Sequence, residues 1–479
     1  MEYEAIIGME VHAQVLTRSK MFCACSADYA SAPANTHTCP VCLALPGVLP
    51  TINQAAVEAT VLTGMALDCT IPPYSKFDRK NYTYPDLPKG YQISQYDYPL
   101  CVGGHLDVDV EGQRRRIRIR RVHLEEDTAK LTHTPDGSLI DCNRAGVPLM
   151  EIVTEADIRS ADEAHAYLTR LRTILRYLGV STGDMEKGAM RCEANISLRP
   201  RGAEALGTKV EVKNLNSFRS VRNAIAYEIE RQSQILASGR VVEQVTMGWD
   251  EERQCTVFQR SKEYAEDYRY FPEPDLPPIE LSPAEVEALR QRLPELPDAK
   301  AQRYEHGLGI KPADVALLVA DRDTALYFEQ AVAARPALAQ TIANWMLGEV
   351  FRYLSETERT AAELPTTPAM LAELVALVDD GTINNTVGKQ VLAEMMASGE
   401  PARAIIERRG LAQISDADTL AQIIADVVAE HAGPVAQYRA GEPKVLGFLI
   451  GQAMRATQGK ANAQMVRELL LRALGQADD

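Results

Sequence analysis

The fold is decided near the N-terminus by the segment Ile6-Ile-Gly-Met-Glu-Val-His-Ala-Gln-Val15. Its polar side chains, among them Glu10 and His12, alternate with apolar ones such as Met9 and Val11. A period of two places successive side chains on opposite faces of a β-strand. The segment therefore predicts a half-buried strand that presents a carboxylate and an imidazole on the same face.

The same alternation returns in two later segments, Met190–Leu198 and Lys209–Lys213. Alternation is typical of antiparallel sheets with one covered face, so we expect these strands to share a polar face with the first. Helical periodicity lies over Ala161–Leu178, between a serine N-cap and a glycine, and again over Ser217–Ser238. This mixture of strands and helices predicts an α+β fold.

The length of 479 residues suggests about three domains of roughly 150 residues each. The proline-rich stretch Phe271–Pro278 cannot form a helix and indicates a stiff boundary. Beyond it the pattern is almost wholly helical, with a second break near Gly399–Pro401. We therefore predict a strand-rich domain over 1–290, an all-α domain over 291–400 and a small helical tail over 401–479.

The composition is that of a globular protein, with 46% hydrophobic and 24% charged residues. A net charge of −15 argues against a protein that coats nucleic acid through bulk charge. From Pro401 onward nine basic residues balance nine acidic ones, so the tail is electrostatically distinct. No apolar run approaches the roughly 20 residues of a membrane span, and Glu2 and Glu4 do not suit a signal peptide. The sequence predicts a soluble, cytoplasmic protein.

Four of the nine cysteines form two close pairs, Cys23-Ala-Cys25 and Cys39-Pro-Val-Cys42. Two such pairs joined by a short loop can close a tetrahedral Cys₄ zinc site. Because four thiolates leave no open coordination position, the predicted zinc is structural. His37 lies inside the loop and could replace one thiolate, and the alternative for it is a solvated loop histidine.

A second candidate site is acidic and combines residues of several predicted strands. Glu10 and His12 share one strand face, and further carboxylates come from the segment His123-Leu-Glu125-Glu126-Asp127, from Glu151 and from Glu193. Hard cations such as Mg²⁺ take carboxylate oxygens, and a histidine can join when strands present such groups on one face. The alternative is a solvated sheet face, because a chain with 66 acidic residues offers many such sets.

A third segment, Lys76–Gln92, mixes cations with tyrosines. The mixture suits phosphate, nucleotide or single-stranded RNA, and the alternative is a loop packed by its own tyrosines. Arg79 and Lys80 could clamp the phosphates of ATP. The arginines that alternate within Arg114–Arg121 indicate either a solvated strand face or a surface for RNA phosphates. The sequence lacks Walker and Rossmann motifs, so ATP would need another kind of site.

Longer motifs follow one another along the whole chain. They include Ile7-Gly-Met-Glu-Val-His-Ala-Gln14, Phe77-Asp-Arg-Lys-Asn-Tyr82, His123-Leu-Glu-Glu-Asp127, Met190-Arg-Cys-Glu-Ala-Asn-Ile-Ser197 and Val212-Lys-Asn-Leu-Asn-Ser-Phe218. Together with the paired cysteines they closely resemble the B subunits of the bacterial aspartyl/glutamyl-tRNA amidotransferase, GatCAB. The resemblance implies an N-terminal cradle similar to glutamine synthetase, then a helical domain and a YqeY-like tail.

The resemblance also implies a reaction. ATP phosphorylates the side-chain carboxylate of misacylated Glu-tRNA(Gln) and/or Asp-tRNA(Asn), and ammonia displaces the phosphate to give Gln-tRNA(Gln) or Asn-tRNA(Asn). A separate glutaminase A subunit supplies the ammonia, and a small C subunit completes a heterotrimer. The chemistry is reasonable, because phosphorylation gives the carboxylate a leaving group and Mg²⁺ offsets charge at the transferred phosphoryl group.

Residue by residue, the resemblance implies Mg²⁺ ligands at His12, Glu125 and Glu151, with Glu10 and Glu193 near a second metal position. The four cysteines match zinc positions of the family.

The tail segments Gly447–Gln452 and Met454–Asn462 resemble the part of the YqeY-like domain that meets tRNA. Arg455 and Lys460 are therefore candidate contacts to tRNA phosphates. Two other functions stay open, a non-catalytic tRNA-binding scaffold and a free-standing small-molecule ligase of the glutamine-synthetase type. The tail and the missing glutaminase chemistry argue against the latter.

Overall fold

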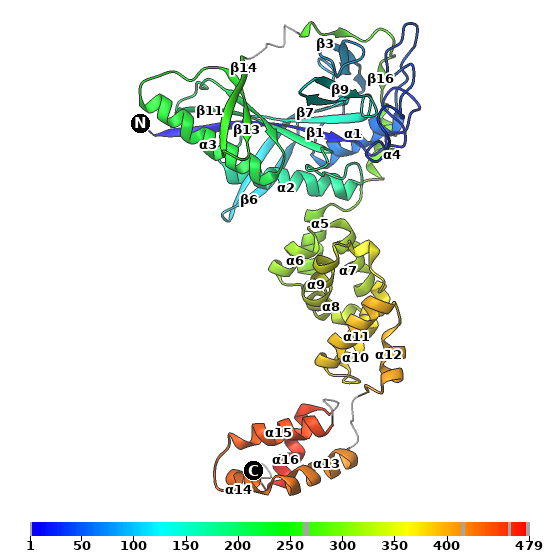
Figure 1. The fold of residues 1–479 in the computed structure, drawn as a ribbon, viewed down its shortest axis with the longest axis vertical. Helices are drawn as coiled ribbons and strands as arrows, with labels where there is room; N and C mark the ends of the chain where they lie inside the picture. The colour runs from blue at the N-terminus through cyan, green and yellow to red at the C-terminus, as the bar shows by residue number, and fades with distance from the viewer. Residues whose placement is uncertain (1, 262–267, 413–416, 458–460, 476–479) are drawn as a thin grey trace. The chain divides into compact units, whose positions relative to one another are not determined.

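The computed structural model describes residues 2–261, 268–412, 417–457 and 461–475. It contains two compact units, Met1–Pro297 and Asp298–Asp479, which Figure 1 colours from blue to green and from yellow-green to red. Among the described residues no helix is both long and apolar enough to cross a bilayer. The predicted boundaries at residues 290 and 400 remain predictions.

A nine-stranded sheet forms the centre of the first unit. β1 (Tyr3–Gln14) pairs antiparallel with β10 (Pro148–Thr154) on one side and with β11 (Met190–Pro200) on the other. β11 in turn pairs antiparallel with β12 (Val210–Leu215), so the predicted strands are neighbours in one sheet. The other members are β5 (Cys101–Val102), β6 (His105–Val110), β7 (Gln113–Glu126), β13 (Val245–Asp250) and β14 (Cys255–Ser261), in the order β14-β13-β12-β11-β1-β10-β7-β5 with β6 beside β7.

One face of this sheet carries the core of the unit. Ile7, Met9, Val11 and Ala13 of β1 are completely buried, as their alternation predicts. The helices α1 (Gln54–Ala66), α2 (Ala161–Leu178) and α3 (Phe218–Ala237) pack into the same core. The other face of β1 carries the half-buried Glu10, His12 and Gln14.

The caps of α2 explain its bounds, which match the prediction. The Ser160 hydroxyl accepts a hydrogen bond from the Glu163 backbone N–H, which satisfies a donor that the first turn leaves unpaired. At the other end Gly179 adopts a φ of +68°, a left-handed conformation that favours glycine, and the helix stops there.

Small sheets and hairpins flank the large sheet. β3 (Asp78–Asn81) pairs with β4 (Tyr91–Ser94) and with β15 (Phe271–Pro272), so the proline-rich stretch lies against the first unit. It contains no helix, as predicted, but the compact unit continues beyond it to Pro297 because Glu273 and Leu276 are buried there. The remaining elements are β2 (Tyr74–Ser75), β8 (Lys130–Thr134), β9 (Gly137–Asp141), β16 (Ile279–Glu280) and α4 (Pro283–Arg290).

The second unit is helical throughout its described residues, as the pattern predicts. It holds two hydrophobic cores, one over residues 304–406 and one over residues 420–474. Ile405 and Ile406 of α12 belong to the first of these cores. The helices are α5 (Pro297–Gln302), α6 (Pro312–Leu318), α7 (Arg322–Ala334), α8 (Ala339–Trp345), α9 (Phe351–Thr357), α10 (Pro368–Asp379), α11 (Asn385–Ser398), α12 (Ala402–Arg409), α13 (Ala417–Glu430), α14 (Ala432–Arg439), α15 (Val445–Ala456) and α16 (Ala463–Ala473), with π-helical turns at Arg303–Gly307 and Met346–Val350 and 3₁₀ turns at Pro336–Leu338 and Ala361–Glu363.

Candidate functional site

The polar face of the large sheet forms the floor of a cleft of about 720 Å³. Residues of β1, β7, β10, β11 and β12 line this floor. Lys80 of β3 and the nearby Tyr82 line the cleft from the small sheet, together with Tyr268 and Tyr270. The cleft therefore joins the strands that carry the acidic candidates to the cationic and aromatic segment.

Three of the predicted metal ligands meet in this cleft. The Nε2 atom of His12 lies 3.5 Å from Glu125 Oε1 and 3.5 Å from Glu151 Oε2. The sheet register explains this, because His12 lies opposite Glu151 on β10, the strand between β1 and β7. One ligand atom from each residue lies within 4.8 Å of the others, and carboxylate oxygens with one imidazole nitrogen suit a divalent cation.

Two side chains that we did not predict support this cluster. His123 is buried, and its Nε2 lies 3.2 Å from Glu151 Oε2 and 3.8 Å from Glu125 Oε2. The Ser94 hydroxyl donates to Glu125 Oε2 at 3.1 Å. The alternation of β7 places His123 on the same face as Glu125, so this signal was available in the sequence. Together these groups fix the orientation of both carboxylates.

The charged groups of the cluster shift one another's pKa values. Burial alone would lower the pKa of His12, but the carboxylates of Glu151 and Glu125 raise it to about 9. Burial alone would raise the pKa of Glu151, but His123 and His12 hold it well below its usual range. The cluster thus favours a positive charge between its carboxylates, which a proton on His12 supplies when no cation is bound.

The second predicted metal position is occupied by a cation of the chain itself. Glu10 and Glu193 lie opposite each other on β1 and β11, and Glu211 of β12 joins them within 4.8 Å. The Lys213 ammonium lies 2.8 Å from Glu193 Oε2, and Asn195 Nδ2 donates to Glu10 Oε1. Lys213 already compensates this second acidic set, so the donor set fits a further metal ion less well than the His12 cluster does.

Arg79 and Lys80, the two predicted phosphate-binding residues, lie next to each other on β3, but their side chains lie on opposite faces of this strand. Lys80 lines the cleft, where its ammonium lies 4.8 Å from the centre of the Tyr268 ring. The guanidinium of Arg79 instead forms a bidentate ion pair with Glu273, at 2.7 and 2.8 Å, and does not line the cleft. Adjacent residues on a strand point to opposite faces, so Lys80 lines the cleft and Arg79 does not, and a phosphate clamp by both residues remains a prediction.

The alternating arginines of β7 form a surface ladder of ion pairs. Arg116, Arg118 and Arg120 each make two hydrogen bonds to a carboxylate, of Asp107, Asp157 and Glu155 respectively. Their side chains are more than half exposed. The solvated face that we considered for this segment is thus the observed arrangement.

The four predicted cysteines gather in one cluster beside the sheet. One sulfur from each of Cys23, Cys25, Cys39 and Cys42 lies within 4.8 Å of the others, and the Cys39 and Cys42 sulfurs are 3.8 Å apart. Sulfurs held about 2.3 Å from one zinc ion in a tetrahedron lie about 3.8 Å apart, so the spacing fits zinc. His37 is not a member of this set within the described residues.

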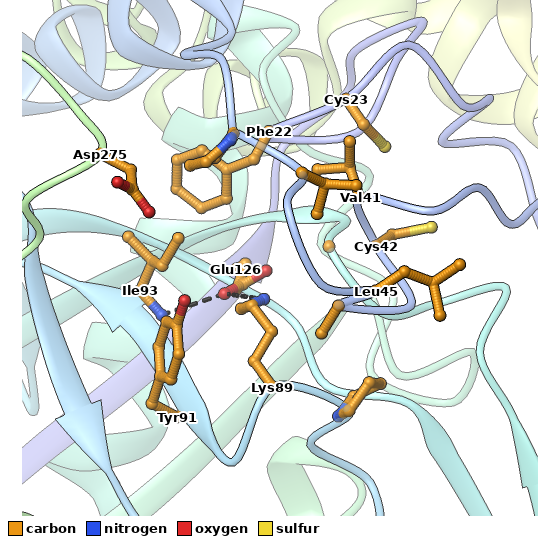
Figure 2. Close-up of a pocket in the computed structure, with 15 residues that line it drawn as sticks. Phe22, Cys23, Val41, Cys42, Leu45, Lys89, Tyr91, Ile93, Glu126 and Asp275 are labelled. Atoms are coloured by element: carbon orange, nitrogen blue, oxygen red, sulfur yellow. Dashed lines mark hydrogen bonds and ion pairs between the residues drawn. The ribbon is translucent and has the colours of Figure 1, made fainter.

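Figure 2 shows a small pocket of about 190 Å³ beside this cysteine cluster. Cys23 and Cys42 lie on one side of it, and Glu126 of β7 lies on the other. Glu126 accepts a hydrogen bond from the Ile93 backbone N–H and forms an ion pair of 2.6 Å with Lys89. Glu126 directly follows Glu125, so this pocket lies next to the strand residue that carries one of the candidate metal ligands.

Comparison with known proteins places the chain among the components of tRNA amidotransferases. Residues 5–287 match the family model described as the GatB/GatE catalytic domain, and residues 326–474 match the model described as the GatB domain. A relative from Thermomicrobium roseum, the B subunit of an aspartyl/glutamyl-tRNA(Asn/Gln) amidotransferase, is 55% identical over 99% of both chains. Relatives with the same name from Moorella thermoacetica and Dehalococcoides mccartyi are 53% and 51% identical, over 98% or more of each chain.

This chain belongs to the family of amidotransferase B subunits. The catalytic-domain match covers the large sheet from residue 5 onward and all three candidate metal clusters, which lie between residues 10 and 211. The second match begins at residue 326, within the all-α region, and includes the predicted tail up to residue 474.

Of the two tRNA contacts predicted in the tail of this B-subunit family member, the structure describes one, Arg455. Arg455 lies in the last turn of α15 and is exposed. Lys460 lies outside the described residues. α15, α13 and α16 share the core over residues 420–474, so Arg455 is presented by a packed helix.

Proposed function

We propose that the cleft phosphorylates the side-chain carboxylate of a misacylated aminoacyl-tRNA with ATP. As a B subunit, the chain is part of an enzyme that forms the C–N bond when Glu-tRNA(Gln) or Asp-tRNA(Asn) is converted to Gln-tRNA(Gln) or Asn-tRNA(Asn). The observation that supports the phosphorylation step best is the convergence of His12, Glu125 and Glu151 on one point of the cleft. A scaffold that only bound tRNA would have no use for such a cluster.

The donor set of this cluster fits Mg²⁺, which prefers oxygen ligands. When bound, Mg²⁺ supplies positive charge where the phosphoryl group meets the anionic carboxylate. The chain's own residues prepare this position, because His123 and Ser94 orient the carboxylates before any ligand arrives. Lys80 then offers a point charge to the phosphates of ATP.

A second buried network lies beside the His12 cluster, because Arg191 of β11 lies opposite His12 of β1. Asp127 is buried and accepts hydrogen bonds from Arg191 at 2.9 Å and from Gln14 at 2.8 Å. Burial raises the pKa of Asp127, but Arg191 and Arg144 lower it further than burial raises it, so the carboxylate stays charged. Arg191 is thereby fixed in the wall of the cleft, within reach of an anionic substrate.

The remaining parts of the reaction belong to partners. We assign the supply of ammonia to a separate glutaminase A subunit, and we expect a small C subunit to complete a heterotrimer. The structural zinc, the helical tail and a cytoplasmic location complete the proposal. Within it, the tail holds the tRNA while the cleft acts on the aminoacyl end.

An isotope experiment tests the phosphorylation step. The heterotrimer is supplied with ATP, ammonium and Glu-tRNA(Gln) in which both side-chain carboxylate oxygens are ¹⁸O. If the carboxylate is phosphorylated, the released phosphate contains one labelled oxygen for each amide formed. Release of unlabelled phosphate during amide formation would contradict an acyl phosphate intermediate.

Removal of the tail tests its role in binding tRNA. We expect a complex that lacks residues 413–479 to bind tRNA more weakly and to show a smaller dependence of affinity on salt. Each phosphate contact that is lost lowers the slope of log K against log salt by roughly 0.7 to 0.9. The cut follows α12 because Ile405 packs in the preceding core.

The matched control for the tail is full-length Arg455→Gln, which should account for about one such contact. The glutaminase reaction of the A subunit should stay nearly unchanged in both proteins. Equal tRNA affinity of the truncated and full-length complexes at the same salt would remove the tail from tRNA binding.

A further inference from the structure

Arg121 is a cation of the cleft with no partner in the described chain. It lies on β7, and its side chain lines the cleft. Its Nε atom is buried without a hydrogen-bond acceptor, and no carboxylate within the described residues forms an ion pair with its guanidinium. Arg121 is half-buried, and a shielded Nε donor without an acceptor is unfavourable, so this arrangement indicates an anionic ligand in the cleft.

The arginines that precede Arg121 on the same strand are fully paired. Arg118 and Arg120 each hold a carboxylate through two hydrogen bonds. An irregularity in the pairing of β10 with β7, after the pair Val153–Arg121, shifts the register at this point. Arg121 precedes His123 by two residues and Glu125 by four, so alternation places all three on the face that lines the cleft.

The same cleft contains a second cation, Lys80. Burial lowers the pKa of Lys80, but Tyr270 and the carboxylates of Glu125 and Glu151 raise it further than burial lowers it. Within the described residues the ammonium of Lys80 contacts the rings of Tyr82 and Tyr268 and forms no ion pair. Burial raises the pKa of the Tyr270 phenol to about 12, and both Lys80 and Arg121 act to lower it, so both cations lie near this phenol. Other cations of the cleft are neutralised, such as Arg191 by Asp127 and Lys213 by Glu193.

We propose that Arg121 is a further catalytic residue, whose guanidinium binds two non-bridging oxygens of the phosphoryl group during its transfer. The proposal rests on the function proposed above. A planar guanidinium matches two phosphate oxygens at once, which a lysine ammonium cannot do. In this step the bond from the γ-phosphorus to the bridging oxygen breaks and its electron pair leaves with ADP, while a carboxylate oxygen of the substrate forms the new bond. Arg121 stays protonated throughout.

The first test measures nucleotide binding to the heterotrimer in the presence of Mg²⁺. Arg121→Gln should weaken the binding of the non-hydrolysable analogue AMP-PNP by about tenfold or more, because the contact is made to the terminal phosphate. Affinity for ADP should change less than about threefold. Arg118→Gln is the matched control, because Arg118 lies on the same strand and is paired with Asp157 on the surface. An equal loss of affinity for both nucleotides would overturn the contact to the terminal phosphate.

The second test measures ATP turnover that depends on misacylated tRNA. Arg121→Gln should lower kcat on the order of 10²- to 10³-fold, with Arg121→Lys retaining part of the activity because it keeps the charge. A loss confined to the KM for misacylated tRNA would overturn the proposal, since the residue would then bind an RNA phosphate. Unchanged glutaminase activity and partial rescue of Arg121→Ala by added guanidinium distinguish a catalytic role from misfolding.

The variant Glu125→Gln separates the two proposals. If Glu125→Gln is inactive and Arg121→Gln turns over ATP within about threefold of the unmodified complex, Arg121 is not catalytic and the proposed function still stands. If both variants are fully active, the proposed function itself is wrong.

Discussion

Replacing Glu125 with glutamine is expected to lower ATP turnover dependent on misacylated tRNA on the order of 10²- to 10³-fold. The substitution keeps the shape of the side chain and the hydrogen bond from Ser94, but it removes the charge that faces His12. A contact that acts in the transition state appears in kcat. Affinity for tRNA should change little, because tRNA is held by many distant phosphate contacts.

The measurement compares Glu125→Gln and Glu151→Gln with the unmodified heterotrimer at matched Mg²⁺ concentration. Glu4→Gln serves as the control, because Glu4 also lies on the sheet but pairs with Arg199 outside the cleft. Glutaminase activity and tRNA affinity should be normal in all three variants. ATP turnover near the normal rate in both Glu125→Gln and Glu151→Gln would leave the non-catalytic scaffold as the better function.

Purified protein is expected to contain about one zinc per chain, and Cys42→Ser is expected to lose it. Cys42 is buried, and its sulfur already accepts a hydrogen bond from the Cys39 backbone N–H and lies 3.7 Å from the Lys20 ammonium. These contacts and the Cys23 thiol lower the pKa of Cys42, so a thiolate is favoured where the metal would bind. Loss of zinc should make the loop between Cys25 and Cys39 more sensitive to protease.

Cys142→Ser is the matched control for the zinc prediction. Cys142 lies near enough to Cys42 for the two thiols to affect each other, yet it is not a member of the four-sulfur cluster. Metal analysis after purification without chelator should give about one zinc for this control. A value near zero in unmodified protein, with all four clustered thiols freely reactive, would show that the cluster does not hold a metal.

The sequence predicts those parts of the structure that depend on local periodicity. The alternation in β1 identified the buried Met9 and the exposed-side His12 without reference to any other strand. The capped periodicity of α2 gave both of its ends, because Ser160 and Gly179 act on the residues next to them. Alternation and helix caps depend only on residues that lie within a few positions of one another in the sequence.

Other features depend on partners that lie far away in the sequence. Arg79 pairs with Glu273, so its exclusion from the cleft depends on a residue 194 positions later in the chain. Glu211 joins Glu10 only through the pairing of three strands. Arg121 has no hydrogen-bond acceptor at its Nε atom within the described residues. That absence depends on where every nearby carboxylate lies, and alternation within β7 does not show these positions. The sequence therefore identified the acidic cluster and missed the charge balance around it.

The position of β1 in the middle of the sheet has a consequence for the order of folding. β1 is synthesised before its two hydrogen-bonding neighbours, β10 and β11, which begin at residues 148 and 190. At about 5–20 residues per second, the ribosome needs on the order of ten seconds or more to make these partners. Until then Ile7, Met9 and Val11 have no sheet to enter, so the nascent chain carries an unpaired apolar strand that needs protection from aggregation.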